Sequence, residues 1–340
     1  MDKMPGLGLV IRECNRTTSN DYQSSGGKTV PVTTGIHHIT AFVNDVQATV
    51  DFYAGVLGLR LVKQSVNFDA PEIHHLYFGN ESGSPGTIIS FFPQEDARQG
   101  TLGGGQVGIT VYAVPKDSLI FWRKRLKHFQ IEVMEATRFD EKYITFTDNS
   151  GLIIELVERE QGPNSWWSLS SVPVEFAIKG FAGALLFSSN SKSTERVLVN
   201  LLGLRKIAAE EGLIRFKADG ELGNVIDLNA ENIPVGEGGA GTVHHIAWRA
   251  KDYAELEAWG SLIGTSEMQS AKIVDRQFYK AMYFREPGNI LFQIATDLPG
   301  FQCDQRIEDL GGRLDLPEQL ESQRAVIEKK LKPFVVRALD

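Results

Sequence analysis

The feature that most constrains the fold of this chain is a set of internal repeats. Leu57-Gly-Leu-Arg60 and Leu202-Gly-Leu-Arg205 are the same four residues, and each set ends a segment whose apolar residues have helical spacing. Gly58 and Gly203 are suitable C-terminal stops for these helices, and a strand-like stretch follows each of them. Such self-similarity indicates that one supersecondary unit has been duplicated.

A second repeat closes the units. Residues 144–155 align without a gap with residues 282–293, and each segment has the pattern of strand, turn and strand. Together the repeats predict four modules, each made of a strand, a helix and three strands. These modules are expected at residues 35–93, 105–158, 180–230 and 242–297. A final amphipathic helix is predicted over residues 316–331, because its leucines and Ile327 lie on or near one face.

The modules divide the chain into regions, with the turn-rich residues between modules two and three as the main break. Residues 1–34 are rich in Ser, Thr, Asn and Gly and are expected to form a flexible tail. The expected regions after the tail are a first domain with modules one and two (35–158), a linker (159–179), a second domain with modules three and four (180–297) and a C-terminal extension with a helix (298–340).

Charge and apolar patterning exclude several classes of function. The net charge of −8 argues against nucleic acid or an anionic membrane as a partner, since both require a basic face. No apolar run approaches the roughly 18 residues that span a bilayer. Neither a Walker-type phosphate loop nor a Gly-x-Ser-x-Gly nucleophile elbow is present. Two cysteines, Cys14 and Cys303, cannot build a disulfide framework, so we expect a reducing cytoplasm.

Four of the seven histidines form two pairs, at the start of modules one and four. The pairs lie in Gly35-Ile-His-His-Ile-Thr40 and Thr242-Val-His-His-Ile-Ala247. Successive side chains of a strand point to opposite faces, so each pair can direct one imidazole inward. A lone pair of this kind is often structural and held by backbone carbonyls. Two pairs at homologous positions favour the alternative, because two inward imidazoles on separate strands are half of a facial metal site.

The chain resembles the vicinal-oxygen-chelate (glyoxalase/extradiol dioxygenase) superfamily. The His-His strands, the Leu-Gly-Leu-Arg segments and the Phe284-Arg-Glu-Pro-Gly288 hairpin carry the resemblance. Within this superfamily, residues 35–305 look like the dioxygenases that open hydroquinones, and His74-His-Leu-Tyr-Phe-Gly79 strengthens that likeness. The resemblance implies an α+β fold in which four βαβββ modules pair into curved open sheets around a cavity. Modules one and four are then expected to share the metal site.

The resemblance also implies a cofactor and its ligands. Fe(II), or alternatively Mn(II), would be held by His38, by His245 and by a glutamate of the last strand of module four. Thr40 lies two residues after His38, so it faces the same way in a strand and could touch the substrate. His37 and His244 correspond to residues that contact the substrate or support the ligands in relatives. Strict alternation would turn both of these away from the metal.

Further candidate residues lie in modules one and four. In relatives, the positions of Arg276 and Tyr283 contact the substrate or support the ligands. An arginine beside a phenolate lowers the pKa of the ring hydroxyl, and a tyrosine could hydrogen-bond it or pass a proton. The third histidine pair, His74-His75, lies where no family ligand lies and is expected to remain outside the site. Glu286 lies in a turn and is expected to be solvated.

The third ligand departs from the family pattern. A glutamate is expected within a Leu-Phe-Glu-Ile-like run, but the run here is Leu291-Phe-Gln-Ile294, while Glu155 holds the equivalent place in module two. The amide oxygen of Gln293 is a weaker donor and does not offset the charge of the metal. Three outcomes follow: a weakly metallated enzyme, an engineered or divergent site, or a binding protein without chemistry. Modules two and three have no histidine on their first strands, so Glu155 is expected to be structural.

The leading hypothesis is a metal-dependent dioxygenase that opens a hydroquinone or catechol with O2, in aromatic degradation or quinone detoxification. Its expected partners are a small aromatic substrate and O2, and assembly into a homo-oligomer is left open. One alternative is a non-catalytic paralogue that binds a quinone or another aromatic molecule. Another is a lyase or isomerase of the glyoxalase type, which uses its metal as a Lewis acid and needs no O2.

Overall fold

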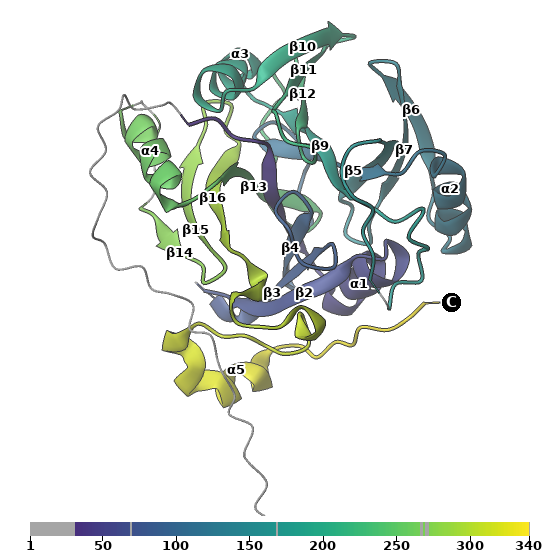
Figure 1. Cartoon of the computed structure of the whole chain (residues 1–340), viewed down its shortest axis with the longest axis vertical. Helices are drawn as coiled ribbons and strands as arrows, with labels where there is room; N and C mark the ends of the chain where they lie inside the picture. The colour runs from purple at the N-terminus through teal and green to yellow at the C-terminus, as the bar shows by residue number, and fades with distance from the viewer. Residues whose placement is uncertain (1–30, 69, 168, 266–267, 269–271, 340) are drawn as a thin grey trace, which may run out of the picture.

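The computed structural model in Figure 1 describes residues 31–339, apart from residues 69, 168, 266–267 and 269–271. Most of the predicted flexible tail, residues 1–30, therefore lies outside the described residues. Thr33 and Thr34, at the end of the predicted tail, hydrogen-bond to the rest of the protein. Thr33 Oγ1 donates to the carbonyl oxygen of Arg249 at 2.9 Å, and the carbonyl oxygen of Thr34 accepts from Gly220 N at 3.0 Å.

Two eight-stranded sheets form the body of the protein, and each joins two modules. The first sheet combines modules four and one, in the order β14 (Val274–Asp275), β15 (Tyr279–Arg285), β16 (Leu291–Pro299), β13 (Thr242–Ala250), β1 (Ile36–Val43), β4 (Ile88–Pro93), β3 (Ala70–Gly79) and β2 (Arg60–Asn67). The second sheet combines modules three and two, in the order β10 (Arg205–Glu210), β11 (Leu213–Lys217), β12 (Val225–Asn229), β9 (Gly180–Phe187), β5 (Gln106–Val114), β8 (Ile153–Glu158), β7 (Glu141–Thr147) and β6 (Met134–Arg138). Both sheets curl (Figure 1), and the predicted α+β, glyoxalase-like fold is confirmed.

The sheets cross the predicted domain boundary, because each pairs a module of residues 35–158 with a module of residues 180–297. The central contacts are antiparallel, between β1 and β13 in the first sheet and between β5 and β9 in the second. The division of the chain into two consecutive domains stays a prediction. What positions the site is the pairing of β1 with β13, which brings the two histidine-bearing strands side by side.

Each module has one helical segment, at the place that the repeats predict. The segments are α1 (Val46–Val50) with its π-helical continuation (Asp51–Val56), α2 (Leu119–His128), α3 (Ser191–Arg196) with its π-helical continuation (Val197–Leu201), and α4 (Tyr253–Gly264). The side chain of Asp45 caps α1 and that of Asn190 caps α3. Gly58 and Gly203 follow with φ of 71° and 79°, a conformation that glycine adopts without strain.

The core follows from the alternation of the strands. In β13, Ile246 and Trp248 belong to the largest buried cluster, which also contains Trp122 of α2 and Trp259 of α4. Ala247 points the other way and belongs to a separate cluster on the opposite face of the first sheet. That opposite face also carries the site described below.

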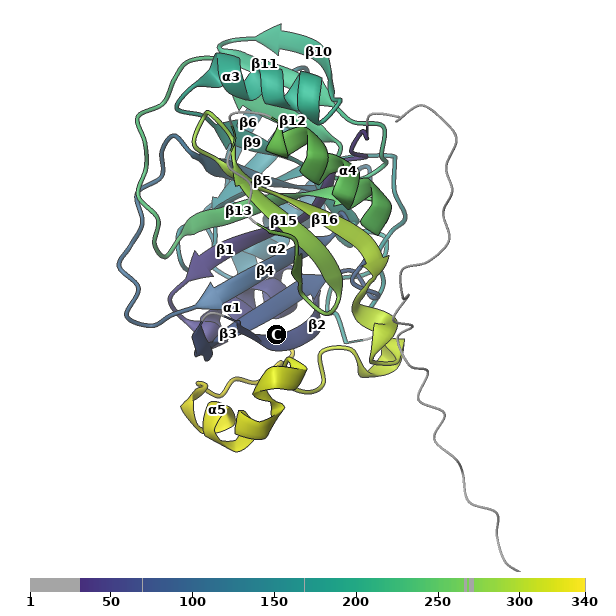
Figure 2. The same ribbon diagram turned by 90° about the vertical axis from the view of Figure 1, so that its left-hand side faces the viewer.

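The C-terminal extension covers β2, the edge strand of the first sheet (Figure 2). It contains short 3-10 turns, among them Glu318–Gln323, and one α-helix, α5 (Arg324–Lys330). The helix predicted over residues 316–331 is therefore α-helical only in its second half, and the segment before that half is a 3-10 turn. The ammonium group of Lys63 is fully buried and lies 2.8 Å from Asp304 Oδ1 and 2.6 Å from Asp315 Oδ2 of the extension. None of the described helices has the length and apolar character needed to cross a membrane.

Candidate metal and substrate site

The two histidine pairs lie at β-bulges. Strands β1 and β13 pair with register shifts that leave His37 as an extra residue on β1 and His244 as an extra residue on β13. A bulge interrupts strict alternation and changes the direction of a side chain. The two rings of each pair therefore meet: the Nδ1 atoms of His37 and His38 are 2.8 Å apart, and those of His244 and His245 are also 2.8 Å apart. Strict alternation does not hold at either pair.

The predicted ligands His38 and His245 come together although they belong to different modules. Their Nε2 atoms are 3.2 Å apart, and the residues are 1% and 2% exposed. Burial lowers the pKa of both imidazoles well below the usual value, and neighbouring histidines and Arg276 lower it further. Both rings are therefore neutral, which is the form that can bind a metal.

Hydrogen bonding fixes the tautomer of His38. The Nε2 atom of His37 lies 3.2 Å from the carbonyl oxygen of Thr296, so this nitrogen carries a proton and donates it. Burial lowers the pKa of His37 to about 4, so its ring is neutral and its Nδ1 is an acceptor. His38 Nδ1 must then donate to His37 Nδ1, and His38 Nε2 keeps a lone pair directed towards His245. Metal-binding histidines are oriented by this kind of second hydrogen bond.

Gln293 fits the place of a third ligand. It lies on β16 opposite Ala247 of β13, and Ala247 in turn lies opposite His38 of β1. The side chain is fully buried, and neither its Oε1 nor its Nε2 has a hydrogen-bond partner among the described residues. Buried amide atoms without partners are costly, typically about 1–3 kcal/mol each. A cation between the two imidazoles would satisfy the amide oxygen, so the donor set fits a divalent metal.

The described part of the chain has no group of three or more His, Cys, Asp and Glu side chains that could hold a metal. That finding agrees with a donor set of two imidazoles and one amide, and it leaves no carboxylate to offset the charge. The ligand roles of His38, His245 and Gln293 stay predictions.

A row of polar side chains, the polar row, crosses the first sheet beside these residues. It consists of His245 on β13, Thr40 on β1, Ser90 on β4 and Tyr77 on β3, each opposite the next. Thr40 Oγ1 lies 3.2 Å from His245 Nε2 and 2.8 Å from Ser90 Oγ. His75 closes the far end, with Nε2 3.0 Å from Ser90 Oγ and Nδ1 2.7 Å from the hydroxyl of Tyr77.

His75 therefore belongs to the site, and the expectation that excluded the His74-His75 pair is wrong for this residue. His74 points to the other face of β3, where its Nε2 lies 2.8 Å from the carbonyl oxygen of Lys332. The sequence contains a signal for this placement, because His75 and Tyr77 are two residues apart on a predicted strand and therefore share a face.

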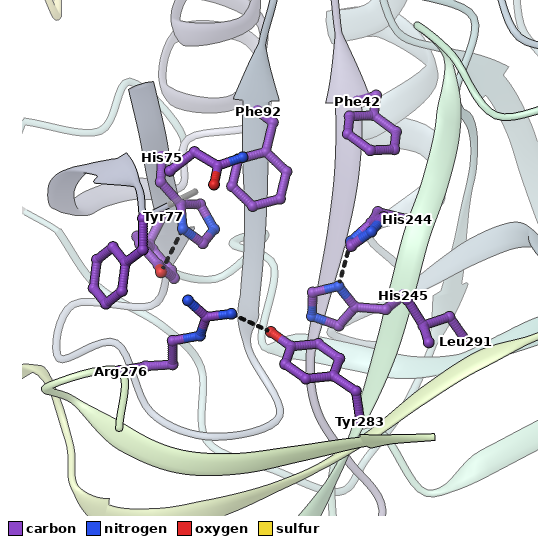
Figure 3. Close-up of a pocket in the computed structure, with 11 residues that line it drawn as sticks. Phe42, His75, Tyr77, Phe92, His244, His245, Arg276, Tyr283 and Leu291 are labelled. Carbon is purple, nitrogen blue, oxygen red and sulfur yellow. Dashed lines mark hydrogen bonds between the residues drawn. The ribbon is translucent and has the colours of Figure 1, made fainter. Parts of the chain in front are cut away.

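A cavity of about 320 Å³ opens along the polar row (Figure 3). Arg276 and Tyr283 reach into it from β15 and the turn before it, and Arg276 Nη2 donates to the hydroxyl of Tyr283 at 3.4 Å. Of the described residues that line the cavity, Arg276 alone carries a formal charge, since burial lowers the pKa of His244 to about 4. The lining is otherwise mostly aromatic and neutral: Phe42, Asn67, Phe68, His75, Tyr77, Phe92, His244, His245, Tyr283 and Leu291.

The second sheet repeats the backbone of the site without its ligands. Glu155 holds the place of Gln293, because it pairs with Val111 and Thr145 as Gln293 pairs with Ala247 and Tyr283. Its carboxylate lies 2.6 Å from Arg138 Nη2, and Arg138 Nε donates to Asp227 at 2.8 Å. The buried ion pairs agree with the structural role expected for Glu155.

Glu286 is buried, so the expectation that it is solvated is wrong. The residue is 1% exposed, and its carboxylate accepts from Gly288 N at 2.8 Å, from Ile290 N at 2.9 Å and from Thr194 Oγ1 at 2.8 Å. The tight turn presents backbone N–H groups that need an acceptor. Glu286 therefore closes the hairpin before β16 and does not reach the site.

Comparison with known proteins gives consistent results along nearly the whole chain. The model of the Glyoxalase/Bleomycin resistance protein/Dioxygenase superfamily matches residues 35–156. MhqO of Bacillus subtilis (strain 168), which its name assigns to the ring-cleaving dioxygenases, is 51% identical over 308 residues, covering 91% of this chain and 99% of MhqO. A chlorohydroquinone/hydroquinone 1,2-dioxygenase of Sphingobium indicum is 30% identical over 302 residues, covering 84% of this chain and 92% of that enzyme.

Solved structures agree. A crystal structure from Bacillus subtilis, named as that of a dioxygenase, has a TM-score of 0.90 and 51% identity and covers 91% of this chain and 99% of its own. Glyoxalase I from Zea mays has a TM-score of 0.59 at 13% identity, covering 80% of this chain and 96% of its own, so it shares the fold alone.

Proposed function

The chain belongs to the ring-cleaving dioxygenases of the Glyoxalase/Bleomycin resistance protein/Dioxygenase superfamily, and from this we propose that it opens a hydroquinone with O2 at an Fe(II) or Mn(II) centre. His38, His245 and Gln293 would hold the metal. The observation that carries the proposal is the 3.2 Å approach of the Nε2 atoms of His38 and His245, with the unpartnered amide of Gln293 in the same sheet.

A divalent metal bound there would supply a Lewis acid with open positions for a substrate oxygen and O2. A neighbouring histidine orients each of the two imidazole ligands. His37 accepts the Nδ1 proton of His38, which leaves the Nε2 lone pair of His38 directed at the site. The Nδ1 atoms of His244 and His245 also lie 2.8 Å apart.

Arg276 and Tyr283 would orient the substrate and lower the pKa of its hydroxyl. The guanidinium group lies over the ring of Phe68, 5.2 Å from the ring centre, and its Nη2 donates to Tyr283. A fixed positive charge beside a phenol favours the phenolate, which is the electron-rich form of the ring. The tyrosine hydroxyl can donate a hydrogen bond to the phenolate or pass a proton on.

The cavity is suited to an aromatic guest that must react away from bulk water. Phe42, Phe68 and Phe92 line it, and their rings exclude water from the space above the polar row. Ring opening breaks one carbon–carbon bond of the diol and places both atoms of O2 in the product, so it requires no external reductant. The hydroquinone class is taken from the name of the relative from Sphingobium indicum.

Gln293 favours a second candidate function, which is binding of a hydroquinone or quinone without turnover. With an amide in place of the carboxylate, the site keeps its full positive charge and holds a metal less firmly. The cavity, Arg276 and Tyr283 would still bind an aromatic molecule. The cytoplasmic location stays a prediction under either function.

Metal content and oxygen uptake separate these functions. The purified protein is analysed for metals, loaded anaerobically with Fe(II) or Mn(II), and mixed with hydroquinone in an oxygen electrode. Uptake that depends on the loaded metal supports the dioxygenase. Binding of hydroquinone without uptake at any metal loading supports the binding protein. A hemithioacetal of glutathione, tested separately, would be converted only if the chain were a lyase of the glyoxalase type.

A further inference from the structure

The far end of the polar row has the chemistry of a second binding point for the substrate. His75 and Tyr77 are 8% and 3% exposed, both line the cavity, and the hydroxyl of Tyr77 lies 2.7 Å from His75 Nδ1. His75 is held from both sides, since its Nε2 lies 3.0 Å from Ser90 Oγ and its ring lies between those of Tyr77 and Phe92. The function proposed above gives no role to His75 or Tyr77.

We propose that the Tyr77 hydroxyl, oriented by His75, binds the second hydroxyl of a para-diol and so selects hydroquinones over catechols and simple phenols. Because the function proposed above places the first hydroxyl beside His38 and His245, this assignment rests on it. The two ends of the polar row would then bind the two ends of one ring.

The register of the strands separates these two ends. Neighbouring strands lie about 4.8 Å apart, so the backbones of β13 and β3, three steps apart, are separated by about 14 Å along the sheet. Figure 3 shows the side chains of His245 and Tyr77 on opposite sides of the cavity. A ring with oxygens at opposite positions can reach both walls. The adjacent oxygens of a catechol would both lie at the histidine end.

Tyr77 can accept this hydrogen bond because the protons of its neighbours are already assigned. Burial lowers the pKa of His75 well below its usual value, and the charge of Arg276 adds to the effect, so the imidazole is neutral. When His75 Nε2 donates to Ser90, its Nδ1 accepts from Tyr77. Tyr279 is a second hydrogen-bond neighbour of the Tyr77 hydroxyl, and the phenolic oxygen has two lone pairs, so it can accept from Tyr279 and from one group in the cavity. Burial also raises the pKa of Tyr77, so it remains a hydroxyl.

The test measures binding in the absence of oxygen, so that it does not depend on turnover. Dissociation constants of hydroquinone, phenol and catechol are measured by calorimetry for the full chain, as purified and after loading with Mn(II). We expect the wild type to bind hydroquinone about tenfold more tightly than phenol, which corresponds to one added hydrogen bond in a dry cavity. Tyr77→Phe removes only the hydroxyl, and we expect it to abolish that preference. His75→Phe should reduce it.

The matched control is His74→Phe, because His74 is the adjacent residue on the same strand and faces away from the cavity. It should keep the wild-type preference, which separates loss of a contact from general damage to β3. Equal affinities of the wild type for hydroquinone and phenol, or an unchanged preference in folded Tyr77→Phe, would overturn the assignment. Discrimination without any oxygen uptake in the separate electrode assay would contradict the dioxygenase function and still support this binding role.

Discussion

His38 Nε2 lies 3.2 Å from His245 Nε2, although 207 residues separate them in the chain. They meet because β1 of module one pairs directly with β13 of module four, and each strand bulges at the preceding histidine. The site therefore requires residues from both module one and module four. A change that weakens the β1–β13 contact should weaken the site even if it leaves every ligand in place.

Gln293→Glu should increase the affinity for metal. A carboxylate would replace an amide and offset one positive charge of the metal. Loss of a hydrogen bond that supports a ligand typically lowers metal affinity about 10–100-fold, and we expect the exchange of a ligand atom itself to change the affinity at least as much. Binding of Fe(II) or Mn(II) to the two proteins is compared by anaerobic titration, together with oxygen uptake. Equal metal loading of the two proteins would show that residue 293 is not a weakened ligand.

Glu155→Gln is the matched control, since Glu155 holds the same place in the second sheet. We expect it to leave metal content unchanged. It should instead lower the free energy of unfolding by about 1–3 kcal/mol, because Arg138 would lose one of its two buried charged partners and keep Asp227. Urea denaturation and metal analysis on the same samples check both expectations.

Arg276→Met should reduce kcat/KM for hydroquinone by about 100-fold if turnover occurs, because the cavity would lose its one charged side chain among the described lining residues. The loss should shrink as the pH approaches the pKa of the substrate, since the phenolate then forms without help. Lys280→Met on β15 is a suitable control, because Lys280 lies over the ring of Tyr253 in α4 and does not line the cavity. An equal loss in both variants would argue against a role at the site.

Lys63→Met should destabilise the protein by about 3 kcal/mol, because the fully buried Lys63 loses its charged hydrogen bonds to Asp304 and Asp315, while Asp315 keeps Arg313 and Gln305 as partners. Asp315→Asn in the same chain should restore part of the loss. The control is Arg337→Met, which removes an exposed ion pair with Asp51 from the same C-terminal extension and should leave the urea midpoint unchanged. Similar urea midpoints for the wild type, Lys63→Met and Arg337→Met would mean that Lys63 does not stabilise the packing of the extension against β2.

Stability should fall when the pH of metal-free protein drops below about 6.5. Burial lowers the folded-state pKa of His37 from 6.5 to about 4, so the unfolded chain takes up its proton first as the pH falls. The contribution is complete above pH 6.5 and is lost between pH 6.5 and 4, at a cost of about 3 kcal/mol. Burial lowers the pKa of His74 in the same direction. Urea midpoints at pH 7 and pH 5 should show the decline, and His74→Phe should show a smaller one.

The sequence was sufficient for the modules but not for their arrangement. The Leu-Gly-Leu-Arg repeats predicted two helices and their ends at Gly58 and Gly203, and the structure has both. The pairing of module one with module four came from the resemblance, since no local pattern encodes which distant strands become neighbours. The bulges at His37 and His244 could not be predicted, because one extra residue in a strand leaves no periodic signal.

Two residues differ from the expectation based on the sequence. The family resemblance places no ligand at His75, but its spacing from Tyr77 puts both side chains on one face of β3. Glu286 was expected in solvent because it lies in a turn, but the backbone N–H groups of Gly288 and Ile290 need its carboxylate. The metal-binding roles of His38, His245 and Gln293 and the contacts of Arg276 and Tyr283 with substrate stay predictions.

The bulges recur in the second sheet, where Gly108 and Ala182 are the extra residues. With Glu155 in the place of Gln293, Gly183 holds the position of His38, because it pairs with Val111 as His38 pairs with Ala247. A β-carbon at Gly183 would lie 1.7 Å from the carbonyl oxygen of Val225, so no side chain fits there unless the backbone moves. The two halves of the duplicated protein are thus no longer interchangeable. Point substitutions in the first sheet can still change the side chains of the site. In the second sheet, a side chain at Gly183 would require the backbone to move, so this sheet is restricted to a structural role.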